Sequence, residues 1–412
     1  MRAEPPSPPP GAALAPEADP GPGPSTRAVH AGAMREAAGG AVVTPVYHSA
    51  TFFSDAAPGG EVRYTRYGRN PNHLAVAEKM RALEGAEASL VLGSGNAAAA
   101  LTLLTLAAAG DHIVAARQLY GGTLRLLTRE LPRLGIETSF IDTPGEWAGA
   151  VRPNTRAFWL ELPVNPTLRI PDIRPIADVA RARGIPLVVD ATFATPINFR
   201  PLGRGATLAL HSATKYLGGH SDVTAGMVSG PAELVEAIRQ TLISFGPVLD
   251  PAAAWLLERG IKTLAVRMAR HNENGVRVAG WLERQPAIAR VHYPGLPSHP
   301  DHAVAKELLD GFGGMVSMVV RGGDEAALRV VNRLRLLSVA PSLGGVESLV
   351  SMPRYTSHEA LTPDQRRALG IDDGFVRLSL GVEDAADIIA DLEQALAPEA
   401  AAIAPAAGAH RS

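Results

Sequence analysis

The sequence predicts an α/β fold, with a large domain built on a mostly parallel sheet and a smaller C-terminal α+β domain. Two observations lead to this prediction. Short apolar runs alternate with helical patterns from residue 73 to residue 190, which is typical of parallel strands joined by crossover helices. After Met227 two helical patterns come first, and strands and helices then follow in a different order. A chain of 412 residues is also too long for one small core.

The periodicity of apolar residues predicts the individual elements. A helix begins near residue 73. In the large domain we expect strands at 88–92, 112–116, 136–141, 155–160 and 186–190, and helices at 96–109, 123–134 and 173–182. The run 206–210 resembles a further strand. Beyond it we expect helices at 233–242 and 252–272, and strands at 313–320, 334–339 and 375–380. These elements place a cofactor-binding domain at 73–262 and the C-terminal domain at 263–397.

The two ends of the chain have an unusual composition. Residues 1–24 are dominated by Pro, Ala and Gly and are expected to be a disordered tail. Residues 398–412, rich in Ala and Pro, are expected to be a flexible tail. Residues 25–72 have few long periodic runs and many Gly, Pro, Tyr and Arg residues. They are predicted to form an extended N-terminal arm.

The composition excludes several classes of function. The net charge is −2, so no basic field attracts nucleic acid or an anionic membrane. Cysteine is absent, which excludes disulfides, Cys-ligated zinc, iron–sulfur clusters and thiol nucleophiles. Neither a membrane-spanning apolar run nor a signal peptide is recognisable. We therefore expect a cytoplasmic protein that acts on a small molecule.

A glycine turn after the predicted strand 88–92 suggests a phosphate-binding site. Gly93–Ala98 matches the pattern G-x-G-x-x-A, which fits either a single phosphate or the pyrophosphate of a dinucleotide. A dinucleotide site requires an acidic residue at the end of the next strand, but Arg117 and Gln118 follow that strand. Arg117 would suit a 2′-phosphate, so an NADP-linked oxidoreductase stays an alternative from a different class.

Two further positions make pyridoxal 5′-phosphate (PLP) the favoured cofactor. Asp190 ends a buried strand, where a carboxylate is costly unless it faces a cation such as a protonated pyridine nitrogen. Lys215 stands alone in a stretch of small and hydroxyl residues. It could form a Schiff base if desolvation or a nearby cation keeps its amine partly unprotonated. Ser212 and Thr214 could donate hydroxyl hydrogen bonds to the phosphate. The alternatives are a structural ion pair for Asp190 and a solvated surface charge for Lys215.

Other side chains are candidates for contacts around such a cofactor. Tyr120 follows a predicted strand, and its ring could stack on a flat cofactor or simply pack half-buried. Arg377 interrupts an apolar strand and suits a substrate carboxylate, with a buried salt bridge as the alternative. His292, His299 and His302 lie in a segment rich in prolines that lacks helical ligand spacing, so no metal site is expected.

Seven motifs, in order along the chain, resemble the PLP-dependent enzymes of Cys/Met metabolism. This is the transsulfuration family, which includes cystathionine γ-synthases, cystathionine γ- and β-lyases and methionine γ-lyases. The motifs occupy residues 25–32, 82–85, 190–196, 211–223, 293–299, 342–349 and 376–384. The resemblance implies a fold-type I PLP enzyme, as in aspartate aminotransferases, and a homotetramer made of two dimers.

The resemblance also implies roles for individual residues. Lys215 would hold PLP and move protons, and Tyr120 would stack on the ring and assist in proton transfer. Asp190 would pair with the pyridine nitrogen and Asn165 would lie near the ring oxygen. Arg377 and Ser342 would take the α-carboxylate of an amino-acid substrate. The phosphate would be bound by Gly95, Asn96, Ser212 and Thr214, and by Tyr64 and Arg66 from a neighbouring subunit.

The chain departs from the family pattern at several positions. Asn96 stands where many members have Met, Pro341 where many cystathionine enzymes have Glu, and Gly122 where methionine γ-lyases have Cys. An additional residue after Arg66 makes Arg69 an alternative for its role. The expected reaction is γ-elimination or γ-replacement of the cystathionine γ-synthase or γ-lyase type. Methionine γ-lyase and cystathionine β-lyase activities are the alternatives.

Overall fold

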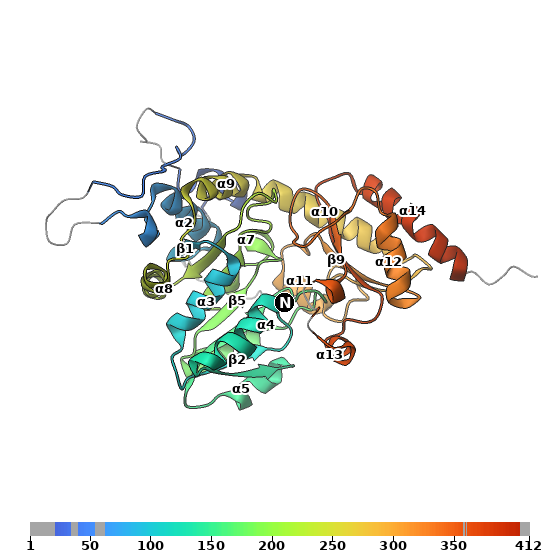
Figure 1. Ribbon diagram of the computed structural model, residues 1–412, viewed down its shortest axis with the longest axis horizontal. Helices are drawn as coiled ribbons and strands as arrows, with labels where there is room; N and C mark the ends of the chain where they lie inside the picture. Colours follow the sequence, from blue (N-terminus) through green and yellow to red (C-terminus); the bar gives the residue numbers. More distant parts are fainter. Residues whose placement is uncertain (1–20, 34–39, 54–61, 357–358, 360, 404–412) are drawn as a thin grey trace, which may run out of the picture.

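The computed structural model describes residues 21–33, 40–53, 62–356, 359 and 361–403. The expected disordered tail falls largely on residues 1–20, which lie outside the described residues, as do 404–412. Residues 21–24 lead into helix α1 (Pro24–His30). Two sheets organise the rest of the chain, and Figure 1 shows them side by side, with the N-terminal arm projecting from the end of the molecule far from the C-terminal part.

The larger sheet has seven strands in the order β1-β7-β6-β5-β4-β2-β3. Strands β6 to β3 in this order are parallel to one another, and β7 is antiparallel to both of its neighbours. The strands are β1 (Ala88–Leu92), β2 (His112–Ala116), β3 (Glu137–Ile141), β4 (Thr155–Glu161), β5 (Leu187–Asp190), β6 (Leu208–Ser212) and β7 (Gly226–Gly230). The predicted α/β fold with a mostly parallel sheet is confirmed.

Helices cover both faces of this sheet because its strands are apolar on both sides. They are α2 (Pro71–Glu84), α3 (Gly95–Leu106), α4 (Gly121–Arg125), α5 (Trp147–Ala150), α6 (Ile173–Arg183), α7 (Thr195–Asn198), α8 (Ala232–Phe245) and α9 (Pro251–Lys262). Leu101 and Leu103 of α3 pack with Ile238 and Leu242 of α8 on one face. On the other face, Ile173 and Ile176 of α6 pack with Phe158 of β4, while α2 and α9 share a further cluster.

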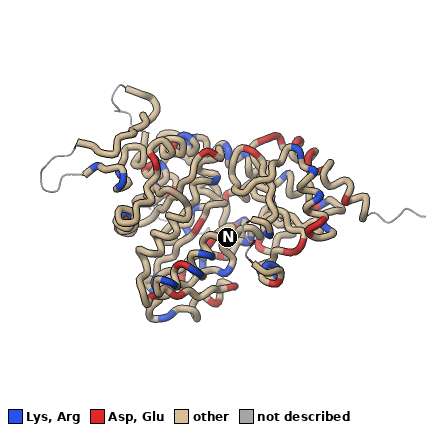
Figure 2. Tube along the Cα trace, in the orientation of Figure 1, with Lys and Arg blue, Asp and Glu red and all other residues tan. Residues whose placement is uncertain are grey.

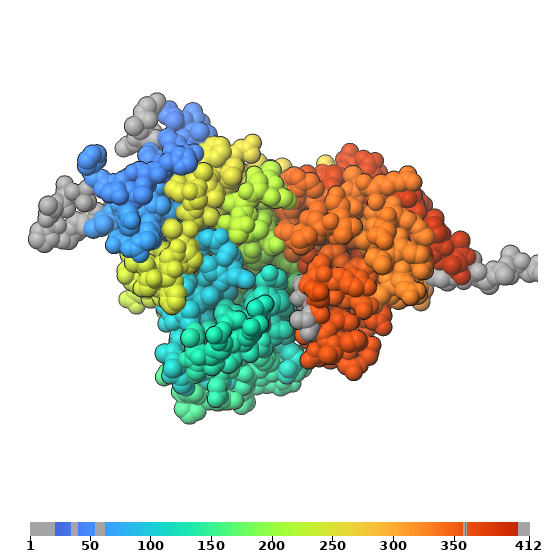
Figure 3. Space-filling view, in the orientation of Figure 1, coloured from blue at the N-terminus to red at the C-terminus, as the bar shows by residue number. Residues whose placement is uncertain are grey.

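The C-terminal part contains a five-stranded sheet in the order β10-β11-β12-β9-β8. Its strands are β8 (Ile288–His292), β9 (Met315–Val320), β10 (Ser338–Val339), β11 (Leu349–Ser351) and β12 (Phe375–Ser379). Its helices are α10 (Leu264–Leu282), α11 (His302–Leu308), α12 (Gly323–Arg333), α13 (Pro363–Ala368) and α14 (Ala385–Ile403). Strands β9 and β12 share one apolar core with α10, α12 and α14. Figure 3 shows this part, in orange and red, packed against the middle of the chain.

Several predicted elements were wrong in extent, each for a local reason. The helix expected at 252–272 is two helices, α9 and α10, because the chain breaks at Thr263, whose hydroxyl donates to the carbonyl of Gly260. The helix expected at 123–134 is α4, a π turn and a 3-10 turn, and Pro132 lacks the N–H that a continuous helix needs. The strand expected at 334–339 shrinks to β10 because the carboxylate of Asp391 takes the N–H groups of residues 335–337.

Strands β7, β8 and β11 and the end of one helix escaped prediction. Strand β7 was not expected, since its glycines hide the apolar pattern; a Cβ on Gly226 would lie 2.1 Å from the carbonyl oxygen of Ser94. Strand β8 was not expected either, because its exposed Arg290 interrupts the apolar run. The flexible tail expected from residue 398 is wrong up to residue 403, because α14 continues and Glu399 is held by Arg329 and Arg333.

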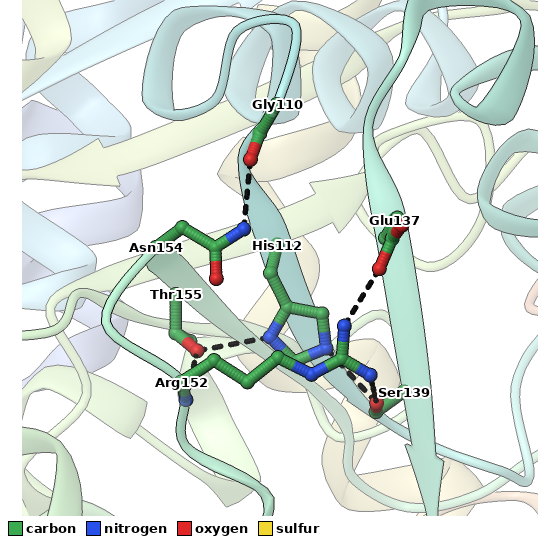
Figure 4. A network of polar contacts seen from close by, with 7 residues as sticks. All are labelled: Gly110, His112, Glu137, Ser139, Arg152, Asn154 and Thr155. Carbon is green, nitrogen blue, oxygen red and sulfur yellow. Dashed lines mark hydrogen bonds and ion pairs between the residues drawn. The ribbon is translucent and has the colours of Figure 1, made fainter.

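The amino ends of strands β2, β3 and β4 are joined by polar side chains (Figure 4). His112 opens β2, and its two ring nitrogens lie 2.9 Å from the hydroxyls of Thr155 and Ser139. Arg152 donates to Glu137 at 2.6 Å across the same edge. Every one of these side chains has a protein partner, so this edge of the sheet is occupied by structural contacts. The opposite edge, where the parallel strands end, is where ligands bind in such sheets.

Candidate active site

A cavity of about 620 Å³ lies at the carboxyl ends of the parallel strands. Its walls come from the ends of β4, β5 and β6, from the start of α3, and from β12 and the segment before β11 of the C-terminal part. The predicted site residues that line it are Gly95, Asn96, Tyr120, Asn165, Asp190, Ser212, Thr214, Lys215, Ser342 and Arg377. Residues that are distant in the sequence therefore converge on one pocket.

One end of the cavity is suited to an anion. Ser94 is the N-cap of α3, and its hydroxyl accepts a hydrogen bond from Ala97 N at 3.0 Å. A Cβ on Gly95 would lie 2.7 Å from Cβ of Ser212, so only glycine allows the backbone to approach β6 this closely. The N-terminus of this twelve-residue helix thus faces Ser212 across the cavity wall, with the favourable end of its dipole toward an anion.

Asp190 lies deep in the cavity at the end of β5. Its side chain accepts hydrogen bonds from the N–H and the hydroxyl of Thr192, at 3.0 and 2.5 Å. Thr192 in turn accepts from Ser212 N at 2.8 Å, which connects the ends of β5 and β6. Burial raises the pKa of Asp190. A cation placed beside this carboxylate would remove the cost of its burial.

Lys215 follows β6 and projects into the same cavity. Its Nζ donates to the hydroxyl of Ser342 at 2.7 Å. Burial, followed by the charge of Arg377, lowers the pKa of Lys215 to about 8. A substantial fraction of the amine is therefore unprotonated near neutral pH, which both a nucleophile and a general base require.

Arg377 reaches the cavity from the middle of β12 and is buried. It donates to Oδ1 of Asn165 at 2.9 Å and to the carbonyl oxygen of Ser342 at 3.0 Å. Its Nε is buried without a hydrogen-bond partner. Among the described residues no carboxylate forms an ion pair with this guanidinium, so it is available to a carboxylate ligand.

The remaining predicted residues differ in how firmly they are held. Tyr120 is 43% exposed, and its backbone N–H donates to Glu161 at 2.7 Å. Asn96 is exposed at the cavity wall. The hydroxyl of Thr214 accepts from Ala225 N at 3.0 Å, so this side chain is already engaged with the backbone beside the cavity.

Tyr64 and Arg66 do not line the cavity of their own chain. They lie in the arm, where Arg66 donates to the carbonyl oxygen of Ile243 at 2.7 Å and its guanidinium stacks near Tyr67. Figure 1 shows the arm at the end of the large sheet that lies away from the C-terminal part. A role for these two residues at a phosphate therefore requires a site on another chain.

Sequence reasoning missed Glu161 and Thr192, which both line the cavity. Glu161 ends the apolar strand β4 in the same way as Asp190 ends β5, so the same pattern could have identified it. Thr192 carries no such signal, since an isolated threonine after a strand is common. His292, His299 and His302 lie outside this cavity, and no group of three or more potential ligands was found among the described residues.

The cavity fits PLP. Its anion-binding end would take the phosphate, the buried Asp190 would face the pyridine nitrogen, and Lys215 would reach the aldehyde. Residues 25–397 match the model of the Cys/Met metabolism PLP-dependent enzymes. The chain belongs to this family. It is therefore a PLP-dependent enzyme of sulfur amino-acid metabolism, and the NADP-linked alternative for Gly93–Ala98 is set aside.

Individual relatives are similar over nearly their whole length. The chain is 42% identical to the L-methionine gamma-lyase of Porphyromonas gingivalis, covering 90% of this chain and 96% of that protein. It is 43% identical to the cystathionine gamma-lyase of Bacillus subtilis, covering 90% and 98%. The crystal structure of cystathionine gamma-lyase from Lactobacillus plantarum, complexed with L-serine, superposes with a TM-score of 0.87 at 38% identity, covering 91% and 98%. These similarities agree with the predicted fold-type I architecture.

Two global properties also agree with the composition. No helix within the described residues is long and apolar enough to cross a membrane. Figure 2 shows Lys and Arg interspersed with Asp and Glu along the chain rather than gathered into one field.

Proposed function

We propose that this protein is a γ-lyase that cleaves the bond between Cγ and sulfur in an amino acid such as cystathionine or methionine. The reaction would consume water and release a thiol, ammonia and a 2-oxo acid. The observation that carries the proposal is the convergence of Lys215, Arg377 and Asp190 in one cavity. The names of the similar proteins, which are mostly γ-lyases, support the same reaction.

Each of these residues has a defined task. PLP, when bound, supplies an electron sink that eases loss of the α-proton. Arg377 binds the α-carboxylate of the substrate and thereby fixes which bond at Cα is broken. The amine of Lys215, with its lowered pKa, takes the α-proton and can return a proton elsewhere on the substrate. Asp190 holds the proton on the ring nitrogen that makes the electron sink effective.

The decisive experiment is a substrate panel. Cystathionine, methionine, cysteine and O-acyl-homoserines are each incubated with the enzyme, with and without an added thiol. A γ-lyase releases a four-carbon 2-oxo acid from thioether substrates without added thiol. Product formation only from O-acyl-homoserine plus thiol would assign γ-replacement instead, and pyruvate from cystathionine would assign β-elimination.

Lys215→Ala provides the matched control. The variant should lose turnover and the cofactor adduct that borohydride reduction traps on the chain. A variant that kept both would refute the assignment of Lys215.

We further propose that the arm completes the cofactor site of a second copy in a homodimer, two of which form the tetramer. Val42 and Phe53 of the arm are almost fully exposed, and such apolar side chains favour burial in an interface. Arg66→Ala and Lys215→Ala variants, each inactive alone, should regain part of the activity when refolded together. The same experiment with Arg69→Ala in place of Arg66→Ala shows which of the two arginines the cofactor site of the second copy requires.

A further inference from the structure

Glu161 is a buried carboxylate that no role described so far explains. It is the last residue of β4, and its Cα pairs with that of Asp190, the last residue of β5, in the parallel register. Both side chains are buried, with exposed fractions of 5% and 9%. Burial makes the charged form of such a carboxylate costly, and repulsion between the two carboxylates at adjacent strand ends adds to the cost. Together these effects raise the pKa of Glu161 to about 8. A group held at such a cost needs a compensating function.

The side chain of Glu161 accepts hydrogen bonds from the backbone of two loops. Oε2 accepts from the N–H of Tyr120 at 2.7 Å, and Oε1 accepts from the N–H of Asn165 at 2.8 Å. The first loop follows β2 and the second follows β4, and these two strands are neighbours in the sheet. One side chain therefore spans two loops that both line the cavity.

Each loop carries a residue whose position matters for the cavity. The ring of Tyr120 is partly exposed and its hydroxyl forms no hydrogen bond with the described residues, so the position of the ring depends on its backbone. The side chain of Asn165 accepts from Arg377 at 2.9 Å. Glu161 thus holds the backbone of the residue that carries the aromatic ring, and it reaches the guanidinium of Arg377 through Asn165.

We infer that Glu161 is a positioning residue that aligns Tyr120 with the cofactor ring and, through Asn165, Arg377 with the substrate carboxylate. The inference rests on the proposed function of these two residues. It goes further because it assigns both alignments to a single carboxyl group that accepts hydrogen bonds from two loop backbones.

Glu161→Gln tests the inference while keeping the shape of the side chain. The amide has one oxygen acceptor, so its NH₂ group must face one of the two backbone N–H donors and that loop is released. We expect kcat/KM to fall roughly ten- to hundredfold, as small misplacements of catalytic groups do. The KM for the amino acid should rise, and the visible circular dichroism of bound PLP should change. Glu161→Asp, which keeps the carboxyl group but withdraws it by one methylene, should show smaller changes of the same kind and guards against a Gln variant that does not fold.

Asp391→Asn is the matched control. Asp391 is also buried and also accepts backbone N–H groups, from Arg335 and Leu337, but it lies in the C-terminal core away from the cavity. The Asp391→Asn variant should have a less stable fold but an unchanged KM and unchanged circular dichroism of bound PLP. Equal effects of both substitutions on these readouts, or an unchanged Glu161→Gln enzyme, would overturn the inference.

Two readouts separate this inference from the proposed function. The circular dichroism of PLP and the spectral titration with glycine, which has a carboxylate but no leaving group, need no turnover. If no sulfur amino acid is cleaved by the unmodified enzyme, the proposed function fails. The inference about Glu161 still stands or falls on these two measurements.

Discussion

The amine of Lys215 lies 2.7 Å from the hydroxyl of Ser342 and donates a hydrogen bond to it. Lys215 belongs to the turn after β6 of the large sheet, whereas Ser342 precedes β11 of the C-terminal sheet. Ser342 has a φ angle of 90°, a left-handed conformation that costs free energy for any residue except glycine. The contact therefore joins the two parts of the molecule at the residue for which we propose the proton transfer.

Two substitutions of Ser342 should distinguish the effect of its hydroxyl on activity from the effect of its strained backbone on stability. Ser342→Ala and Ser342→Gly both remove the contact with the amine, which is worth about 1.5–3 kcal/mol for a charged group, so kcat/KM should fall roughly ten- to hundredfold in both. Glycine also relieves the strain, and the Gly variant should be about 1 kcal/mol more stable than the Ala variant. Activity assays and thermal unfolding measure the two effects. Equal stability of the variants would contradict the strain at this position.

Covalent capture of PLP by the apoenzyme should depend on pH. Only the unprotonated amine of Lys215 reacts, and its pKa is lowered to about 8 by burial and by Arg377. The capture rate should therefore rise with pH and level off above about 8. Arg377→Met removes one cause of the lowered pKa, so the rise should move to higher pH. Stopped-flow absorbance follows the capture, with Arg329→Met, on α12, as the control. An unmoved pH profile in Arg377→Met would refute the coupling.

Gly95→Ala should weaken cofactor binding. The added methyl group would lie 2.7 Å from Cβ and 2.8 Å from Oγ of Ser212, so the start of α3 has to move away from β6. Such overpacking costs about 1–3 kcal/mol of stability. Urea unfolding and titration of the apoenzyme with PLP measure both losses. Gly149→Ala in α5 is the control, because nothing lies within 4 Å of its added Cβ. A normal PLP affinity in Gly95→Ala would argue against the phosphate site.

Glu399→Gln should lower the melting temperature at neutral pH. Hydrogen bonds from Arg329 and Arg333 lower the pKa of Glu399 to about 2. A carboxyl group with a lowered pKa stabilises the fold above its unfolded pKa, and this contribution is lost as pH falls toward the folded value. The difference in melting temperature between wild type and variant should thus shrink from about pH 4.5 toward pH 2. Glu393→Gln, exposed on the same helix, should change little at either pH.

The strands that could be predicted are those whose buried residues form a consecutive apolar run in the sequence. β1 and β2 were expected with their observed bounds, because apart from His112 at the start of β2 all their residues are apolar or small. β7 was missed, since its glycines are required by the close approach of Ser94, a residue distant in the sequence. The break between α9 and α10 was missed because apolar periodicity continues across it, while the carbonyl of Gly260 accepts from the hydroxyl of Thr263 and from the guanidinium of Arg267.

For the site, residue type and position at strand ends were sufficient to select the chemistry. Asp190 after an apolar strand, Lys215 among small residues and the glycine turn at Gly95 were recognisable one by one and now lie in one cavity. Glu161 shows the same pattern but was not selected, because its importance depends on the hydrogen bonds that it accepts from two backbone N–H groups. Those groups come from loops that are adjacent only in the folded sheet.

By itself, then, the sequence determined which functional groups this protein carries and which family of cofactor chemistry they suit, because side-chain type and apolar periodicity are local properties. Only the tertiary structure decided how the groups act on one another. The lowered pKa of Lys215, its contact with Ser342 and the link from Glu161 through Asn165 to Arg377 all depend on burial and on distances of a few ångströms between segments far apart in the chain. Desolvation and hydrogen bonding act through space, and the order of residues does not encode them directly.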